Sequence, residues 1–247
     1  MKHSKSKHSK IKHKNCISLF ILLICIITML ISGFYILKWF RENRRNKKVI
    51  NNIISSVAVQ NEELLVDFQK LKKENKNTVA WLKVEGTNIE YPVVKENDNS
   101  FYLTHGFDDS YNSAGWIFAD YTNLFDGTDK NIVIYGHNRR DGSMFGSLKK
   151  VLENKWCENL DNRSIILVTE KGNIKYEVFS VYKIKNENYY ITTKFNSNDE
   201  FKEFIYTLKE RSIYNFETDV EKTDKILTLS TCADNNQYRV VLHAKKQ

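Results

Sequence analysis

The sequence predicts a mostly β protein, a barrel of seven or eight strands with peripheral helices, preceded by one transmembrane helix and a helical N-terminal region. Short apolar runs of strand length follow one another from residue 78 to residue 244, and an uncharged stretch lies near the N-terminus. One proline and nine glycines exclude collagen-like and proline-rich low-complexity classes. With 247 residues, 41% of them hydrophobic, the chain can bury one core of moderate size.

The uncharged stretch, CISLFILLICIITMLISGFYIL, covers residues 16–37. At about 1.5 Å per residue, a helix of this length spans roughly 33 Å, which matches a hydrocarbon core of about 30 Å. A cleaved secretory signal would have a shorter apolar run and an A-x-A-like cleavage site, and the sequence shows neither. Residues 16–37 are therefore predicted to be a transmembrane signal-anchor helix that follows a basic tail, residues 1–15.

The orientation of this helix is poorly determined by its flanks. Six lysines precede the apolar stretch, and six lysines or arginines with one acid follow it, so the positive-inside rule barely discriminates. The short lysine tail has nothing to fold, whereas a long C-terminal part can be translocated regardless of its charge. We therefore expect a single-pass cell-membrane protein with a cytoplasmic N-terminus and an extracytoplasmic C-terminal domain.

The formal net charge of +8 is confined to the N-terminal segment. Residues 1–48 contain twelve lysines and arginines and one acid, Glu42, which leaves 26 basic and 29 acidic residues, or −3, for the rest of the chain. The part of the chain that folds has no net electrostatic attraction to phosphate, and a nucleic-acid partner is not expected.

Residues 38–75 are predicted to be a basic juxtamembrane segment followed by helices. Ile50, Ile53, Ile54 and Val57 recur at i, i+3, i+4 and i+7, the spacing of one helix face, and the apolar pattern continues to residue 73.

Residues 76–247 are predicted to form one β-rich domain. The sequence EKGN at 170–173 indicates a hairpin. Two helices interrupt the strands, one marked by apolar residues from Met144 to Trp156 and one at 198–211 that opens with a capping box of Ser197 and Glu200. The predicted strands are 78–84, 89–94, 114–120, 131–137, 163–169, 173–184, 225–231 and 238–244.

Four cysteines constrain the chemistry. Cys16 and Cys25 lie in the apolar stretch, and Cys157 and Cys232 lie in the domain. No C-x-x-C or Cys/His spacing suggests zinc, so we expect neither a metal nor another cofactor. A disulfide between Cys157 and Cys232 is one interpretation of the pair, although a domain of this size does not need a single bridge for its stability.

Cys232 ends the apolar strand KILTLST, and Arg239 begins the next strand. A thiol with a pKa of about 8.5 needs a neighbouring base or cation to act as a nucleophile at neutral pH. His137 ends the apolar strand NIVIYG and is a candidate base, whereas His105 and His243 fit structural roles more simply.

The sequence TLSTC, with an arginine seven residues later, and a strand that ends in GHN resemble the active-site signature of the sortases, membrane-anchored cysteine transpeptidases of Gram-positive bacteria. The resemblance extends through WLKVEGTNIEYPVV at 81–94 and covers nearly the whole domain. The N-terminal helical region and the helix at 198–211 are similar to class B. Neither a second apolar span after the domain nor an Asp-Pro lid motif before it is found, which argues against the pilus-polymerising class.

The resemblance implies roles for six residues. Cys232 would be the nucleophile, His137 the general acid and base, and Arg239 the cation that binds the oxyanion and orients the substrate. The positions that match the substrate groove of the family are Ser230, Asn99 and Leu103.

The implied reaction cleaves a C-terminal sorting signal of a surface protein after threonine through a thioacyl-enzyme. It then joins the protein to an amine of a lipid-linked peptidoglycan precursor. In class B the signals resemble Asn-Pro-x-Thr-Asn. Two alternatives stay open: a Cys/His protease or hydrolase that uses water as acceptor, and a non-catalytic, membrane-tethered binding barrel.

Overall fold

The structure, a computed structural model, describes residues 5–60, 63–185, 187–232 and 238–247, and of residues 5–17 and Cys232 only the backbone. The chain divides into two compact units, Met1–Asn46 and Lys47–Gln247.

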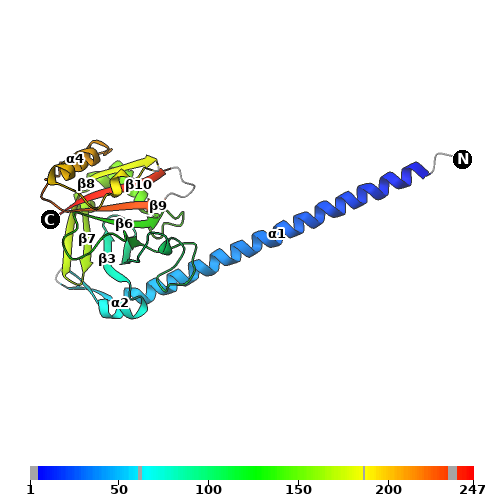
Figure 1. The fold of residues 1–247 in the computed structure, drawn as a ribbon. Coiled ribbons are helices and arrows are strands. Elements are labelled where there is room, and N and C mark those ends of the chain that lie inside the picture. The colour runs from blue at the N-terminus through cyan, green and yellow to red at the C-terminus, as the bar shows by residue number, and fades with distance from the viewer. Residues whose placement is uncertain (1–4, 61–62, 186, 233–237) are drawn as a thin grey trace. The chain divides into compact units, whose positions relative to one another are not determined.

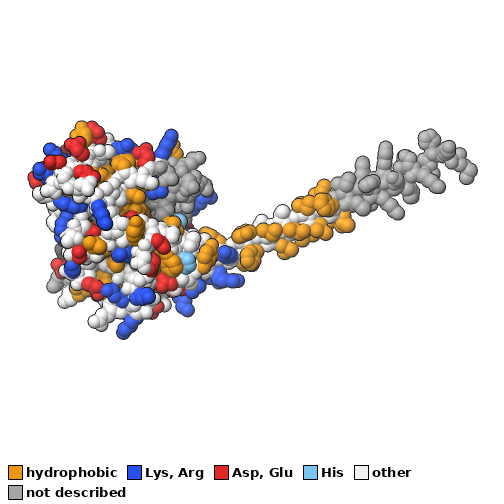
Figure 2. All heavy atoms as spheres, in the orientation of Figure 1, with side chains coloured by type: hydrophobic (Ala, Val, Ile, Leu, Met, Phe, Trp, Pro, Cys, Tyr) orange, Lys and Arg blue, Asp and Glu red, His pale blue; other side chains and the backbone are white. Residues whose placement is uncertain are grey.

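The first unit consists of one long apolar helix, α1 (Lys5–Ile54), whose last turns belong to the second unit (Figure 1). Within the described residues, Ser18–Ile54 is the one helical stretch long and apolar enough to cross a membrane. Its large apolar side chains are exposed, and Figure 2 shows them covering the described part of the helix. A single long apolar N-terminal helix is therefore confirmed.

The segment after α1 differs from the helices predicted for residues 47–73. Here α1 stops at Ile54, and two strands, β1 (Val57–Gln60) and β2 (Glu63–Val66), pair before the short helix α2 (Phe68–Glu74) begins. In β2 the side chain of Leu64 is buried and that of Leu65 is exposed. Buried and exposed side chains therefore alternate here as they do in a strand. The prediction that the apolar residues of this part lie on one face of a helix is wrong.

The second unit is built on a closed barrel of eight strands, which confirms the predicted fold class. The strand order is β10-β8-β7-β3-β4-β5-β6-β9, and the β4–β5 and β6–β9 pairs are parallel whereas the other pairs are antiparallel. The strands are β3 (Thr78–Val84), β4 (Ile89–Val94), β5 (Phe118–Ala119), β6 (Asn131–His137), β7 (Ser164–Thr169), β8 (Gly172–Lys185), β9 (Ile226–Cys232) and β10 (Tyr238–Lys246).

One predicted strand and one predicted helix are shorter than expected. The strand at 114–120 is reduced to β5, because residues 112–115 form a turn in which the Gly115 N–H donates to the Asn112 carbonyl at 2.9 Å. The prediction of a single helix from Met144 to Trp156 is wrong. It is replaced by the 3₁₀ turn η2 (Leu148–Leu152) and the short helix α3 (Asn154–Glu158), because Glu153 between them has an extended backbone.

Two apolar clusters hold the second unit together. The larger one contains most of the buried apolar residues of the barrel strands, including Trp81 and Leu82. The smaller one includes Tyr190 from the 3₁₀ turn η4 (Tyr189–Ile191), Phe201 from α4 (Asn198–Glu210) and Val241 from β10. Figure 1 shows α4 beside β8 and β10. The Ser197 half of the predicted capping box of α4 is present, since the Glu200 N–H donates to the Ser197 hydroxyl at 3.1 Å, whereas the Glu200 carboxylate accepts from the N–H of Asn196 at 2.6 Å.

Candidate active site

Three strand ends bring Cys232, His137 and Arg239 to the same end of the barrel. The parallel register of β6 and β9 pairs His137 with Cys232 at the last residue of each strand. Neighbouring strands lie about 4.8 Å apart. In the antiparallel pair β9–β10, Val241 faces Ser230. The pairing of β9 with β10 ends at these two residues, and Arg239 lies two residues beyond Val241 in β10 just as Cys232 lies two residues beyond Ser230 in β9.

The imidazole of His137 is oriented by a backbone carbonyl. Its Nε2 lies 2.8 Å from the carbonyl oxygen of Leu103, the last residue of the 3₁₀ turn η1 (Phe101–Leu103). A carbonyl oxygen only accepts hydrogen bonds, so Nε2 carries the hydrogen, and in the neutral ring Nδ1 holds the free lone pair. The ring therefore has one nitrogen committed to the protein and one nitrogen that can accept a proton.

Gly115 makes room for this ring. Its backbone has φ +58°, and a Cβ at this position would lie 2.8 Å from Cδ2 of His137 and 2.5 Å from the carbonyl oxygen of Tyr102. Both distances are below normal contact, so only glycine fits beneath the imidazole. Sequence reasoning missed this residue, although a glycine inside a strand-like pattern can signal a close backbone approach.

The guanidinium of Arg239 is held from one side. Its Nη1 donates to the phenol oxygen of Tyr190 at 3.3 Å, and that oxygen lies 3.0 Å from the hydroxyl of Ser230. Its Nε is buried and has no hydrogen-bond partner among the described residues. Tyr190, which the sequence pattern did not reveal, therefore anchors one side of the guanidinium.

The three residues predicted to bind substrate lie in different settings. Ser230 is fully buried, and its hydroxyl contacts Tyr190. The amide of Asn99 donates to Asp120 at 2.8 Å and accepts from the Tyr121 N–H at 3.0 Å. Leu103 is half-buried and contacts His137 through its carbonyl. Leu103 therefore adjoins the candidate base, while the polar groups of Ser230 and Asn99 are bound by other protein groups.

Comparison with known proteins decides the family. Residues 82–247 match the Sortase domain family. The sortase B of Listeria monocytogenes is 32% identical over 232 residues, which cover 90% of this chain and 94% of the relative. The chain belongs to the sortase family. It is a sortase B-like cysteine transpeptidase, a type of enzyme that anchors surface proteins.

Solved structures agree with this assignment. A Bacillus anthracis protein described as similar to sortase B has a TM-score of 0.74 and 36% identity, covering 84% of this chain and 96% of its own. A Staphylococcus aureus sortase B–substrate complex has a TM-score of 0.72 and 30% identity, with the same two coverages. The resemblance to class B sortases is thus confirmed at the level of fold and family.

Behind the strand ends, this sortase contains a buried carboxylate that sequence reasoning missed. Asp120 is 5% exposed, and its oxygens accept from Tyr135 at 2.8 Å, from Asn99, and from the Thr122 hydroxyl at 2.6 Å. Burial and then the Asp120 charge raise the pKa of Tyr135, so its phenol stays protonated and donates to the carboxylate. The network fixes β6, two residues before His137, to the segment that contains Asn99.

The remaining cysteine and histidines of the sortase domain have structural environments. Cys157 is a free thiol, 1% exposed, whose Sγ donates to the Val151 carbonyl at 3.2 Å, and burial raises its pKa. The disulfide alternative for Cys157 and Cys232 is therefore not realised. His105 stacks on Phe101 with ring centroids 4.0 Å apart, and His243 is fully buried.

Proposed function

We propose that this sortase cleaves a C-terminal sorting signal after its threonine and transfers the surface protein to an amine of a lipid-linked peptidoglycan precursor. The observation that carries the proposal is the strand register, which pairs His137 with Cys232 and directs Arg239 to the same end of the barrel. The barrel supplies a nucleophile, a base and a cation from three different strands.

In the first half of the reaction, the sulfur of Cys232 bonds to the threonyl carbonyl carbon and its proton moves to Nδ1 of His137. The carbonyl oxygen becomes negative, and the positive charge of the Arg239 guanidinium stabilises it. His137 then gives the proton to the leaving amine as the peptide bond breaks, and a thioacyl-enzyme remains.

In the second half, an amine of the peptidoglycan precursor attacks the thioester. His137 accepts the amine proton through the same nitrogen, the new amide bond forms, and the Cys232 thiol is regenerated. The hydrogen bond from Nε2 to Leu103 holds the ring in one orientation for both halves. The resident residues complete this cycle without a cofactor.

The sorting signal that we assign is of the Asn-Pro-x-Thr-Asn type. Solved structures include a Staphylococcus aureus sortase B–substrate complex and a sortase B complexed with triglycine. In this chain the side chain of Leu103 is half-buried beside His137 and would provide an apolar wall for the signal. The amide of Asn99 and the Ser230–Tyr190 pair would fix the shape of the groove around it.

The proposed domain organisation follows from the same function. Residues 1–15 form a cytoplasmic tail, residues 16–37 cross the membrane, residues 38–75 form the juxtamembrane region, and residues 76–247 form the extracytoplasmic catalytic domain. The length and composition of α1 and its exposed apolar side chains support the anchor.

Product analysis with and without an amine tests the proposed reaction. The full chain, in a non-ionic detergent, is incubated with an Asn-Pro-x-Thr-Asn peptide alone or with triglycine, and the products are identified by mass spectrometry. We expect cleavage after threonine in both cases and a threonyl-triglycine product when the amine is present. Cleavage to the free acid that triglycine does not alter would favour the hydrolase alternative, and no cleavage at all would favour the binding barrel.

A further inference from the structure

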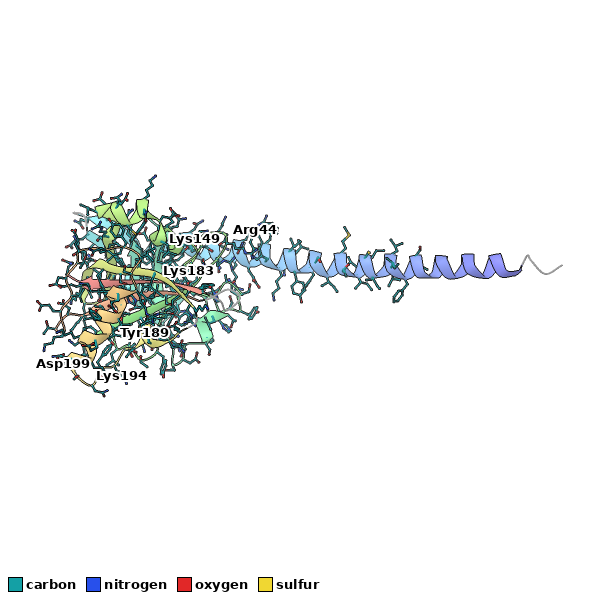
Figure 3. All side chains as sticks on the ribbon, turned by 90° about the horizontal axis from the view of Figure 1, so that it is seen from above. Arg44, Lys149, Lys183, Tyr189, Lys194 and Asp199 are labelled. Atoms are coloured by element: carbon teal, nitrogen blue, oxygen red, sulfur yellow. The ribbon has the colours of Figure 1, made fainter. Side chains whose placement is uncertain are left out.

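Three arginines follow the apolar part of α1 on one face of the helix. Arg41, Arg44 and Arg45 stand at i, i+3 and i+4, a spacing at which side chains are neighbours on the helix surface. All three side chains are exposed, and Figure 3 labels Arg44 on α1. We call Arg41, Arg44 and Arg45 the arginine face.

If residues 16–37 cross the bilayer, the backbone of Arg41 lies at the depth of lipid headgroups, and Arg44 and Arg45 lie within one further helical turn of it. At about 1.5 Å per residue, Arg41 lies roughly 6 Å and Arg45 roughly 12 Å beyond Leu37 along the helix. Each headgroup layer is about 5–8 Å thick, and charges act across a Debye length of about 8 Å at physiological salt. Trp39 and Phe40, whose rings meet edge to face at 5.0 Å, separate the apolar stretch from the arginines. Such aromatic residues are typical of the membrane interface.

The positive charge of residues 38–48 is not explained by the orientation of the helix in the membrane. Residues 38–48 contain six lysines and arginines and one acid, Glu42, whose carboxylate lies 3.9 Å from the Lys38 ammonium. In the proposed orientation this flank is outside the cell, where the positive-inside rule does not call for cations. Arginine also presents a planar fork of donors that matches phosphate geometry, which a point charge does not.

We propose that the arginine face binds the phosphates of anionic glycerophospholipids, such as phosphatidylglycerol, in the outer leaflet of the membrane that α1 crosses. This inference rests on the membrane anchor in the proposed function. The complementary charge and the continuity with the apolar stretch identify lipid as the occupant. The consequence is a lipid preference at the outer end of the anchor that is independent of the chemistry at Cys232.

Trp39 provides a local reporter for this site. It is 44% exposed, whereas Trp81, Trp116 and Trp156 are at most 4% exposed. Bromine atoms on lipid chains quench tryptophan only at short range, so brominated lipids report on Trp39 in the full chain. A Trp39→Phe variant verifies that the quenching signal comes from this residue.

The experiment reconstitutes the full chain in mixed bilayers in which either phosphatidylglycerol or phosphatidylcholine carries the bromine. We expect phosphatidylglycerol to be enriched around Trp39 by at least about fivefold, the factor that about 1 kcal/mol from a single surface cation would produce, and the enrichment to fall with added salt. The triple variant R41Q/R44Q/R45Q should lose this preference. The matched charge-loss control K149Q/K155Q/K194Q, at exposed positions of the second unit, should keep it.

The outcomes separate this inference from the proposed function. Equal quenching by the two lipids in the unaltered chain, or an unchanged preference in the arginine triple variant, would overturn the lipid site. Absence of quenching by either lipid would overturn the membrane anchor and the lipid site together. Turnover of a soluble sorting peptide by the arginine triple variant should match that of the unaltered chain, so a catalytic failure would appear separately.

Discussion

At the residue scale, the direction of each hydrogen bond decides what the candidate catalytic groups can do. The Leu103 carbonyl accepts a hydrogen bond from Nε2 of His137 and so leaves Nδ1 for the proposed proton transfer. Tyr190 accepts from one end of the Arg239 guanidinium, and Nε of the same group stays buried without a partner among the described residues.

Arg239→Lys should therefore impair turnover severely although the charge is kept. A lysine cannot bind Tyr190 and an oxyanion through one planar group. We expect kcat to fall about 100-fold, the usual effect of losing one oxyanion donor. The same exchange at the exposed ion pair of Arg211 and Glu187, Arg211→Lys, is the matched control and should leave kcat unchanged. Nearly intact activity of the Arg239 variant would remove its role at the oxyanion.

Gly115→Ala should displace the imidazole of His137 and lower kcat by about 10- to 100-fold, because small displacements of a catalytic group are costly. Gly127→Ala is the control, since Gly127 also has positive φ but a Cβ there would meet no atom within 4 Å. Both variants carry backbone strain, and only the first contacts the catalytic ring. Equal activity of the two variants, measured on samples with matching circular dichroism, would show that Gly115 does not position His137.

The placement of Cys232, His137 and Arg239 near strand ends could be predicted, because each lies where an apolar strand of a recognisable motif ends or begins. Tyr190 and Asp120 could not be predicted, because their roles depend on contacts with residues distant in sequence. Tyr190 reaches Ser230 across 40 residues, and nothing in the sequence around it differs from an ordinary polar loop. The local pattern of apolar residues predicts where a strand ends, but it does not predict which loop packs against that end.

At the element scale, a second polar network attaches η4 to the barrel strands. The two ring nitrogens of His243 in β10 contact the Thr228 hydroxyl at 2.9 Å and the Tyr182 hydroxyl at 2.8 Å. Thr228 donates to the side chain of Asn131, which in turn donates to the carbonyl of Thr192, directly after η4. Because η4 also contains Tyr190, this network supports the group that holds Arg239.

The network predicts that the protein loses stability in acid. Burial lowers the pKa of His243 to about 3, whereas the unfolded chain has the ordinary value of about 6.5. Above pH 6.5 both states are neutral at this residue, and below it the unfolded state takes up a proton that the folded state does not. The contribution of His243 to the free energy of unfolding should therefore fall by up to about 1.4 kcal/mol per pH unit from about pH 6 towards pH 3.

Urea unfolding of the full chain in non-ionic detergent, at pH 7, 6, 5 and 4, measures this effect. His243→Gln should be less stable than the unaltered chain at pH 7, and its free energy of unfolding should depend less steeply on pH. The two chains share all other acidic and basic groups, so those groups affect both curves alike. Parallel curves over the whole range would show that His243 is not held neutral.

The sequence pattern predicted most strands well, because alternating or continuous apolar residues specify β structure locally. It failed for β1 and β2, where a few apolar residues fit both periods, and for the helix at 144–156. At Met144 the backbone has φ +51° and pairs with Asn138, a conformation that helical spacing of apolar residues cannot reveal. Short elements are decided by the packing around them more than by their own periodicity.

At the scale of the whole molecule, barrel closure creates the candidate site. His137 and Cys232 are 95 residues apart in sequence and become partners only when β9 inserts between β6 and β10. The intervening chain supplies β7, β8 and α4, which close the barrel and cover part of its outer surface. The charge is also divided along the chain, with +11 on residues 1–48, which include the proposed anchor, and −3 on residues 49–247. The three candidate catalytic residues therefore all lie in the second unit.

The central claim is that Cys232 is the residue that becomes acylated by the sorting signal. The most direct measurement is tandem mass spectrometry of the full chain after brief incubation with an Asn-Pro-x-Thr-Asn peptide and acid quenching. We predict a thioester-linked adduct, ending in threonine, on the fragment that contains Cys232, its disappearance on addition of triglycine, and its retention in Cys157→Ala. An adduct on another residue, or undiminished turnover by Cys232→Ala, would contradict the account.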